Sequence, residues 1–228
     1  MLPGMKGTRP MCFSTTASFI GGISLSVLGV ATVKRTERKA EIPFAMIPLL
    51  FGAQQIVEGM LWLSFRLDAP LLNVTMTYTF TLFSHVLWPM YVPFSIGLME
   101  TVAWRKKVIS AFQIIGVAVG LYLLYFIIRF PVTSEVNEHI VYVLPYVNEH
   151  PVLEFYLAAT CVAPFFSSHR IINIFGALAL LLFMVAYWFY TIAFFSVWCF
   201  FAAILSVVIY LHFKFGNERA PYLMRHRA

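Results

Sequence analysis

Long runs of apolar residues follow one another along the chain, and short polar or charged stretches separate most of them. A helix crosses the hydrocarbon core of a bilayer, about 30 Å thick, with roughly 20 apolar residues. The runs predict seven membrane-spanning helices, at residues 13–33, 42–66, 75–99, 108–128, 151–168, 171–190 and 194–213. No Gly or Pro divides the last two, so six spans ending in one long tilted helix are the alternative. We favour seven, because residues 171–213 are roughly twice as long as one crossing needs.

The composition indicates that lipid is the solvent of this chain. Charged residues make up only 11% of it and hydrophobic residues 61%, whereas soluble domains carry roughly 25% charged residues. The sequence therefore predicts an all-α polytopic membrane protein, a single seven-helix transmembrane domain over residues 1–228. Within it we expect an N-terminal extension at 1–10, an outer loop at 129–150 and a cytoplasmic tail at 214–228. The first span lacks the features of a cleavable signal peptide, so we expect it to remain as an anchor.

Lysine and arginine are distributed unevenly between the two sides of the predicted bundle. Short loops rich in these residues stay in the cytoplasm. With the N-terminus outside, the inner side collects Lys34, Arg35, Arg38, Lys39, Arg105, Lys106, Lys107, Arg170, Lys214, Arg219, Arg225 and Arg227, and the outer side keeps Lys6, Arg9, Arg66 and Arg129. This bias predicts an outside N-terminus and a cytoplasmic C-terminus. It also explains the net charge of +6 by topology and contact with the lipid bilayer, with no nucleic acid as a partner.

Small residues recur at a spacing of four on two of the predicted spans. They are Ser14, Ser18, Gly22 and Ser26 on the first, and Gly116 and Gly120 on the fourth. Small side chains at this spacing let two helices approach closely in lipid. We therefore predict that both stripes serve helix packing.

Polar residues interrupt the second span, in the stretch "FGAQQIVEGMLW" at residues 51–62. A charged side chain at the centre of a bilayer costs at least ~2.5 kcal/mol, so such groups normally face the interior of a bundle. Gln54, Gln55 and Glu58 lie on one face of the predicted helix, and Trp62 lies one turn further along it. The segment therefore predicts one wall of a polar pocket.

The third and fifth predicted spans carry side chains that could face this wall. On the third, Tyr78, Thr81, His85 and Trp88 recur at a helical spacing, and on the fifth Glu154 lies near the outer end. Glu58 and His85 both fall roughly 12 to 15 Å below the outer surface. The predicted pocket residues are Gln54, Gln55, Glu58, Trp62, Tyr78, Thr81, His85, Trp88 and Glu154.

A carboxylate and an imidazole at one depth support more than one function. Our leading hypothesis is the binding or passage of a small solute or ion, linked to a proton on Glu58 and His85. The alternative is a metal-dependent, hydrolase-like intramembrane enzyme, in which zinc binds Glu58, His85 and Glu154, with Cys12 or Cys199 as further ligands. A third hypothesis is a sensor or structural subunit whose polar groups only fix the helix register. Cys12 and Cys199 lie near the outer side, where either a disulfide or two buried thiols would fit.

The outer loop contains the sequence "VNEH" twice, at residues 136–139 and 147–150. A hairpin that turns near Leu144 would bring the two copies opposite each other. Glu138, His139, Glu149 and His150 would then form a second candidate metal site. The other interpretation is a lid at the membrane interface, whose apolar face rests on the bundle.

Four stretches of the chain carry a resemblance to a known family. "MCFSTTASF", "PLLFGAQQIVEGMLW", "HVLWP" and "SVWCFFAAILS" resemble recurring blocks of an uncharacterised bacterial multi-pass membrane-protein family whose members open with Met-Cys-Phe-Ser. The resemblance covers nearly the whole chain from Met11 onward, and it implies that residues 1–10 are an upstream start or an extension. It also implies the bacterial inner membrane as the location. No activity carries over, but Cys12, Gln55, Glu58, Trp62, His85, Trp88, Pro89, Trp198 and Cys199 lie within the shared blocks.

Overall fold

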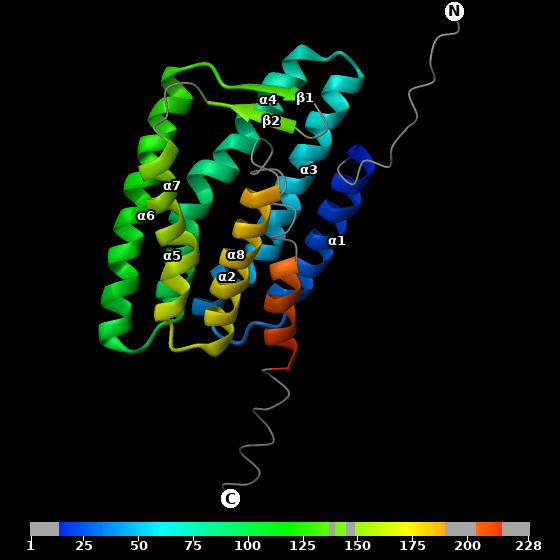
Figure 1. Cartoon of the computed structure of the whole chain (residues 1–228). Helices are drawn as coiled ribbons and strands as arrows, with labels where there is room; N and C mark the ends of the chain where they lie inside the picture. Colours follow the sequence, from blue (N-terminus) through cyan, green and yellow to red (C-terminus); the bar gives the residue numbers. More distant parts are fainter. Residues whose placement is uncertain (1–13, 137–139, 145–148, 190–203, 216–228) are drawn as a thin grey trace, which may run out of the picture.

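The computed structural model describes residues 14–136, 140–144, 149–189 and 204–215, without the side chains of residues 149, 150 and 189. This part of the chain is helical apart from one two-stranded hairpin and short connections (Figure 1). The predicted all-α architecture is therefore confirmed, with the hairpin as an addition.

The described helices run up and down alternately, so that the described connections lie at the two ends of the bundle (Figure 1). The elements are α1 (Thr15–Val33), η1 (Lys39–Glu41), α2 (Ile42–Ala45), α3 (Ile47–Arg66), α4 (Pro70–Thr81), η2 (Leu82–Leu87), α5 (Trp88–Met99), α6 (Ala103–Arg129), β1 (Thr133–Val136), β2 (Ile140–Val143), α7 (Glu149–Leu157), η3 (Ala158–Val162), η4 (Ala163–Phe166), α8 (Arg170–Phe189) and a last helix, Ile204–Phe215.

Five helical segments of the described chain are long and apolar enough to cross a membrane. They are Thr15–Val33, Lys39–Arg66, Pro70–Met99, Ala103–Arg129 and Arg170–Trp188. Two further apolar helices, Pro151–Phe166 and Ile204–Phe215, are shorter. Each of the seven predicted spans thus contains an apolar helix, and five of these helices have the length that a full crossing requires.

The last two predicted spans are separate helices. The start of α8 and the end of the last helix lie at the same end of the bundle (Figure 1). One straight helix over residues 171–213 would instead hold its two ends about 60 Å apart. The alternative of a single long tilted helix is therefore wrong for this fold.

Small residues hold α1 against α3, as the spacing on the first span predicts. A Cβ atom added to Gly22 would lie 3.0 Å from the carbonyl oxygen of Gly52, and one added to Gly29 would meet the backbone of Leu49. Ser26 also faces Gly52. Ser14 has a different role, because its hydroxyl accepts a hydrogen bond from the backbone N–H of Ala17 and so caps α1.

The contact between α5 and α6 depends on proline and glycine together. Pro93 has no N–H, so the helix cannot donate a hydrogen bond to the carbonyl of Pro89 one turn earlier. That carbonyl points at Gly116, where any added Cβ would collide with it. Gly120 similarly leaves room for Met90. The predicted packing role of both glycines is confirmed.

The hairpin covers the end of α3 and the neighbouring part of α4. Thr133 pairs with Val143, and Val136 pairs with Ile140, so the strands turn between residues 136 and 140. The prediction of a turn near Leu144 is wrong, because Pro145 provides no N–H to extend the ladder beyond that point, whereas the polar residues of the first "VNEH" copy separate two β-branched runs.

The hairpin lies on the bundle through its apolar face. Ile140 is fully buried against Leu61 and Trp62, and the ring of Tyr142 stacks on Phe80 with centroids 4.4 Å apart. These contacts agree with the interpretation of the loop as a lid. Glu138, His139 and the side chains of Glu149 and His150 lie outside what the structure describes, so the second metal site stays a prediction.

Candidate functional site

Helix α3 buries three polar side chains in its middle. Gln54, Gln55 and Glu58 are 0%, 2% and 2% exposed. The amide of Gln55 donates to Oε2 of Glu58 at 3.3 Å, across one turn of the helix. Burial of a carboxylate is costly unless hydrogen bonds compensate it, so this turn of α3 is a specialised part of the bundle and not a lipid-facing surface.

A hydrogen bond and a ring contact fix α3 against α5. The indole N–H of Trp88 donates to Oε1 of Gln54 at 2.8 Å, and the ring of Trp88 stacks on Phe51 with centroids 4.0 Å apart. On α3, Glu58 lies about 6 Å beyond Gln54 toward the hairpin end, and on the antiparallel helix His85 lies about 4 Å from Trp88 in the same direction. The register therefore places Glu58 and His85 at nearly the same depth.

His85 lies on a π-helix, η2, in which each backbone hydrogen bond joins residues five apart, so that the turn is wider than in an α-helix. In this pattern the carbonyl of Ser84 faces residue 89, which is a proline without an N–H. The hydroxyl of Tyr156, on α7, donates to this carbonyl at 2.6 Å. Ser84 Oγ in turn lies 2.7 Å from Nδ1 of His85. The widened turn thus joins His85 to α7.

A second π-helix, η3, begins at Ala158, directly after the end of α7 and two residues after Tyr156. Its residues Thr160 and Cys161 are buried, and the hydroxyl of Thr160 donates to the Tyr156 carbonyl at 2.8 Å. Cys161 is a free thiol whose Sγ lies 3.6 Å from the Thr160 hydroxyl. Because π-helices occur frequently at functional sites, two of them joined by Tyr156 mark this part of the bundle as the best candidate.

The structure divides the predicted pocket residues into three groups. Gln54, Gln55, Glu58, Thr81, His85 and Trp88 are buried together on α3, α4, η2 and α5. Trp62 is buried under the hairpin, and Tyr78 accepts a hydrogen bond from the backbone N–H of Val132 at 3.3 Å. Glu154 is exposed on α7, so it does not contribute to the buried group.

The predicted metal site has no complete ligand set in the described residues, where no three His, Cys, Asp or Glu side chains gather closely enough to hold an ion. The further predicted ligands, Cys12 and Cys199, lie outside these residues, as does any disulfide between them. Zinc binding therefore stays a prediction.

Sequence reasoning missed Ser84 and Tyr156 as parts of the site. Ser84 directly precedes His85, but a regular α-helix would turn adjacent residues to different sides. Tyr156 resembles an interfacial aromatic residue in the sequence, yet it is 3% exposed. The widened turn brings both into contact with the His85 segment, and the one available signal was Pro89, five residues after Ser84.

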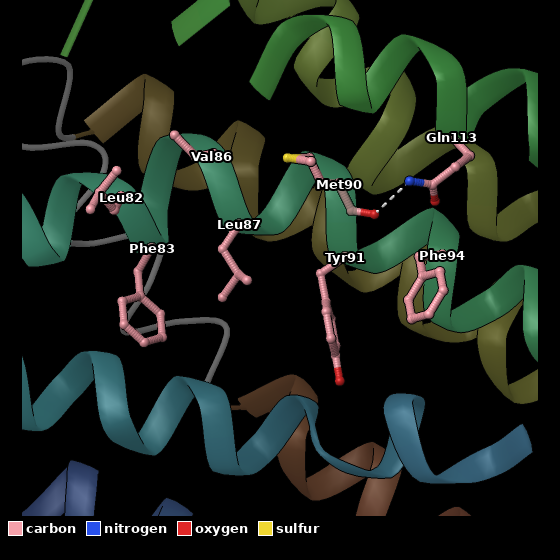
Figure 2. A pocket seen from close by; sticks show the side chains of 8 residues that line it. All are labelled: Leu82, Phe83, Val86, Leu87, Met90, Tyr91, Phe94 and Gln113. Carbon is pink, nitrogen blue, oxygen red and sulfur yellow. Dashed lines mark hydrogen bonds between the residues drawn. The ribbon is translucent and has the colours of Figure 1, made fainter. Parts of the chain in front are cut away.

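An apolar groove of about 520 Å³ lies along η2 and α5, beside α6. Figure 2 shows its lining residues: Leu82, Phe83, Val86, Leu87, Met90, Tyr91, Phe94 and Gln113. Within it the amide of Gln113 donates to the carbonyl of Met90 at 3.1 Å. None of the buried polar residues of α3 lines this groove, so the groove is distinct from the candidate site.

A second buried carboxylate, Glu100, lies at the opposite end of the bundle from the hairpin. It is 2% exposed and accepts hydrogen bonds from the backbone N–H groups of Val102 at 2.8 Å and Ser168 at 2.6 Å, and from the Ser168 hydroxyl at 2.9 Å. Burial by itself would raise the pKa of Glu100, but these hydrogen bonds outweigh it, and the pKa lies below its ordinary value. Glu100 therefore serves as an ionised clamp between the start of α6 and the start of α8.

Comparison with known proteins gives one match. Residues 11–224 match a family of unknown function, DUF6629. No curated protein and no solved structure matches the chain. Because the match covers nearly the whole sequence, the chain belongs to the DUF6629 family.

Proposed function

We propose that this chain is a multi-pass protein of the bacterial inner membrane that binds or passes a small solute or ion and exchanges a proton at Glu58 and His85. The observation that carries the proposal is the burial of these two side chains, at 2% and 5% exposure, at one depth in adjacent helices. A network that only fixed helix register would be served by amides, which do not titrate. A carboxylate and an imidazole each can gain and lose a proton.

The proposed topology has seven spans, with the N-terminus outside and the C-terminus in the cytoplasm. The distribution of charge supports it, because the end of the bundle away from the hairpin carries most of the described basic residues: Lys34, Arg35, Arg38, Lys39, Arg105, Lys106, Lys107, Arg170 and Lys214 (Figure 1). Cytoplasmic loops are enriched in Lys and Arg. A fluorescent protein that matures only in the cytoplasm should therefore fluoresce when fused after Ala228.

Proton exchange can be tested in liposomes that enclose a pH-sensitive dye and contain the purified protein. A pH gradient is imposed, and the internal pH is followed after addition of Na⁺, K⁺, Mg²⁺, or members of a panel of monosaccharides and amino acids. We expect at least one of these probes to accelerate proton movement above the rate in empty liposomes. Glu58→Gln, which keeps the shape and removes the charge, should abolish that acceleration.

Glu154→Gln is the matched control, because it makes the same chemical change at an exposed carboxylate. It should retain the wild-type rate. The proposal fails if no probe changes the proton flux, or if Glu58→Gln and Glu154→Gln behave alike. The unfolding of both variants in detergent shows whether a lost flux reflects lost folding.

A further inference from the structure

The apolar groove of Figure 2 lies on the surface of the bundle. Its lining residues recur along one face of the helix that η2 and α5 form, from Leu82 to Phe94. These two residues are 39% and 47% exposed, so the groove opens outward and does not belong to the interior of the bundle. A contiguous apolar surface of this kind needs an apolar partner, and around a membrane-spanning helix that partner is lipid.

The length and the depth of the groove match one acyl chain. The helix from Leu82 to Phe94 extends over about 18 Å, and one leaflet of a bilayer contains about 15 Å of hydrocarbon. Phe94 lies about 7.5 Å before the end of α5 at Met99, and lipid headgroups occupy about 6 Å on each side of the membrane. One end of the groove therefore lies close to the headgroups, on the side of the bundle away from the hairpin.

Hydrogen bonds hold a neighbouring segment against each side of the groove. On one side, the amide of Gln113 in α6 donates to the carbonyl of Met90 at 3.1 Å (Figure 2). On the other, the hydroxyl of Tyr91 donates to the carbonyl of Pro43 in α2 at 2.8 Å. The groove thus has one wall from α6 and another from α2.

A lysine follows each wall toward the end of the bundle away from the hairpin. Lys106 lies seven residues before Gln113 on α6, so two helical turns bring it to nearly the same face, about 10 Å closer to that end. Lys39 begins η1, which packs against α5, and it precedes Pro43 by four residues. Both lysines are exposed. Their ammonium groups can therefore reach the headgroup region beside the end of the groove.

The carboxylates near these lysines are already bound by other groups. Glu41 pairs with Arg38 at 2.7 Å, and Glu100 is buried in its clamp. In the part of the chain that the structure describes, no carboxylate forms an ion pair with Lys39 or Lys106. The end of the groove is therefore positively charged, and a negatively charged headgroup would complement it.

We propose that this groove binds an anionic phospholipid of the cytoplasmic leaflet, with one acyl chain along η2 and α5 and the headgroup phosphate between Lys39 and Lys106. Basic pockets between membrane-spanning helices on the cytoplasmic side bind such headgroups. The apolar groove supplies affinity for the chain, and the lysines supply selectivity for charge. The inference rests on the proposed membrane topology and not on proton exchange at Glu58 and His85.

Photo-cross-linking in phosphatidylcholine liposomes tests the site. The purified full-length protein is reconstituted with a trace of phosphatidylglycerol that carries a photoreactive group in one acyl chain, and labelled peptides are identified by mass spectrometry. We expect labelling within residues 82–94. It should exceed labelling by the same probe with a phosphocholine headgroup at least about five-fold, which corresponds to the ~1 kcal/mol that one Lys near an anionic surface contributes. Equal labelling by the two probes would overturn the proposal.

Substitution of the lysines tests the headgroup contact. Lys106→Gln and Lys39→Gln should each reduce labelling by the phosphatidylglycerol probe about five-fold and leave labelling by the phosphatidylcholine probe unchanged. Lys107→Gln is the matched control, because Lys107 is also exposed but lies about 120° from Gln113 around α6. It should retain wild-type labelling. The proposal fails if Lys107→Gln loses as much as Lys106→Gln, or if both of the other variants label like the wild type.

Leu87→Trp tests the seat of the acyl chain, because an indole there would fill the groove. It should reduce labelling by both probes, whereas Ile114→Trp, at a 71% exposed position of α6 outside the groove, should not. Unchanged labelling in folded Leu87→Trp would contradict the proposal. Selective labelling without any proton flux would refute the proposed function alone, whereas flux that depends on Glu58 without a preference for phosphatidylglycerol would refute the lipid site alone.

Discussion

The helices of this protein meet in two different ways. Between α1 and α3, and between α5 and α6, the backbones themselves touch, because Gly22, Gly29 and Gly116 have no side chain to separate them. Around the candidate site and at Glu100, the elements meet through polar groups: Gln54 with Trp88, Tyr156 with Ser84, and Glu100 with Ser168.

The two kinds of contact should respond differently to substitution. Where two backbones touch, the atoms cannot move apart without separating the helices, so the stability of the contact depends on the size of one residue. A polar contact tolerates a change of shape but fails when one partner is removed, since a buried donor or acceptor is then left without a hydrogen bond. The bundle therefore uses glycine where only distance matters and polar side chains where the direction of a contact matters.

The largest effect should come from Gly116→Ala. The added Cβ would collide with the carbonyl oxygen of Pro89, and we expect a loss of about 3 kcal/mol in the free energy of unfolding. Denaturant unfolding in detergent micelles measures it. Gly97→Ala in α5 is the control, because its Cβ would meet only Ile109 at 3.5 Å. Similar losses in both variants would mean that the α5–α6 contact does not depend on close approach.

Glu100→Gln should have the next largest effect. The amide would keep one oxygen and turn its NH2 group toward one of the two backbone donors, that of Val102 or that of Ser168, which now bind different oxygens of the carboxylate. We expect a loss of about 2 kcal/mol, the range for hydrogen bonds to a charged group. Glu37→Gln, at an exposed position near the same end, should change the unfolding free energy very little. A Glu100→Gln protein as stable as the wild type would show that Glu100 does not clamp α6 to α8.

Trp88→Phe tests the polar contact at the candidate site. The phenyl ring can still stack on Phe51, but the hydrogen bond to Oε1 of Gln54 is lost. We expect a loss of about 1 kcal/mol, because this buried acceptor loses a donor. Trp188→Phe changes a tryptophan that is 83% exposed and should be neutral. Equal unfolding curves for the two variants would show that stacking alone joins α3 to α5.

The smallest effect should be a difference in acid sensitivity. The pKa of Glu100 in the folded chain lies below its ordinary value of 4.5. Its stabilising contribution is therefore complete above the pKa of the unfolded chain and is lost as the pH falls through the folded pKa. Wild-type stability should fall more steeply below about pH 4.5 than that of Glu100→Gln. Parallel pH profiles would indicate that Glu100 is not an ionised clamp.

Much of the backbone packing could be predicted from local sequence features. Gly22, Gly116 and Gly120 were identified by spacing alone, because a helix returns to the same face about every four residues and small residues there have one use in lipid. The polar face of α3 was identifiable for the same reason. Glu154 shows the limit, since its predicted place near the outer end of a span did not reveal that it is exposed and apart from the buried group.

By itself, the sequence determined which segments are apolar helices, which faces pack closely, and that Gln54, Gln55 and Glu58 share a buried side. These features depend on residue type and helical period, which act within one element. The tertiary structure decided the widened turn at His85, its contact with Tyr156, the clamp at Glu100 and the register of the hairpin. Each of these depends on a donor or an acceptor that a distant segment brings into reach, and no local pattern records which distant groups will meet.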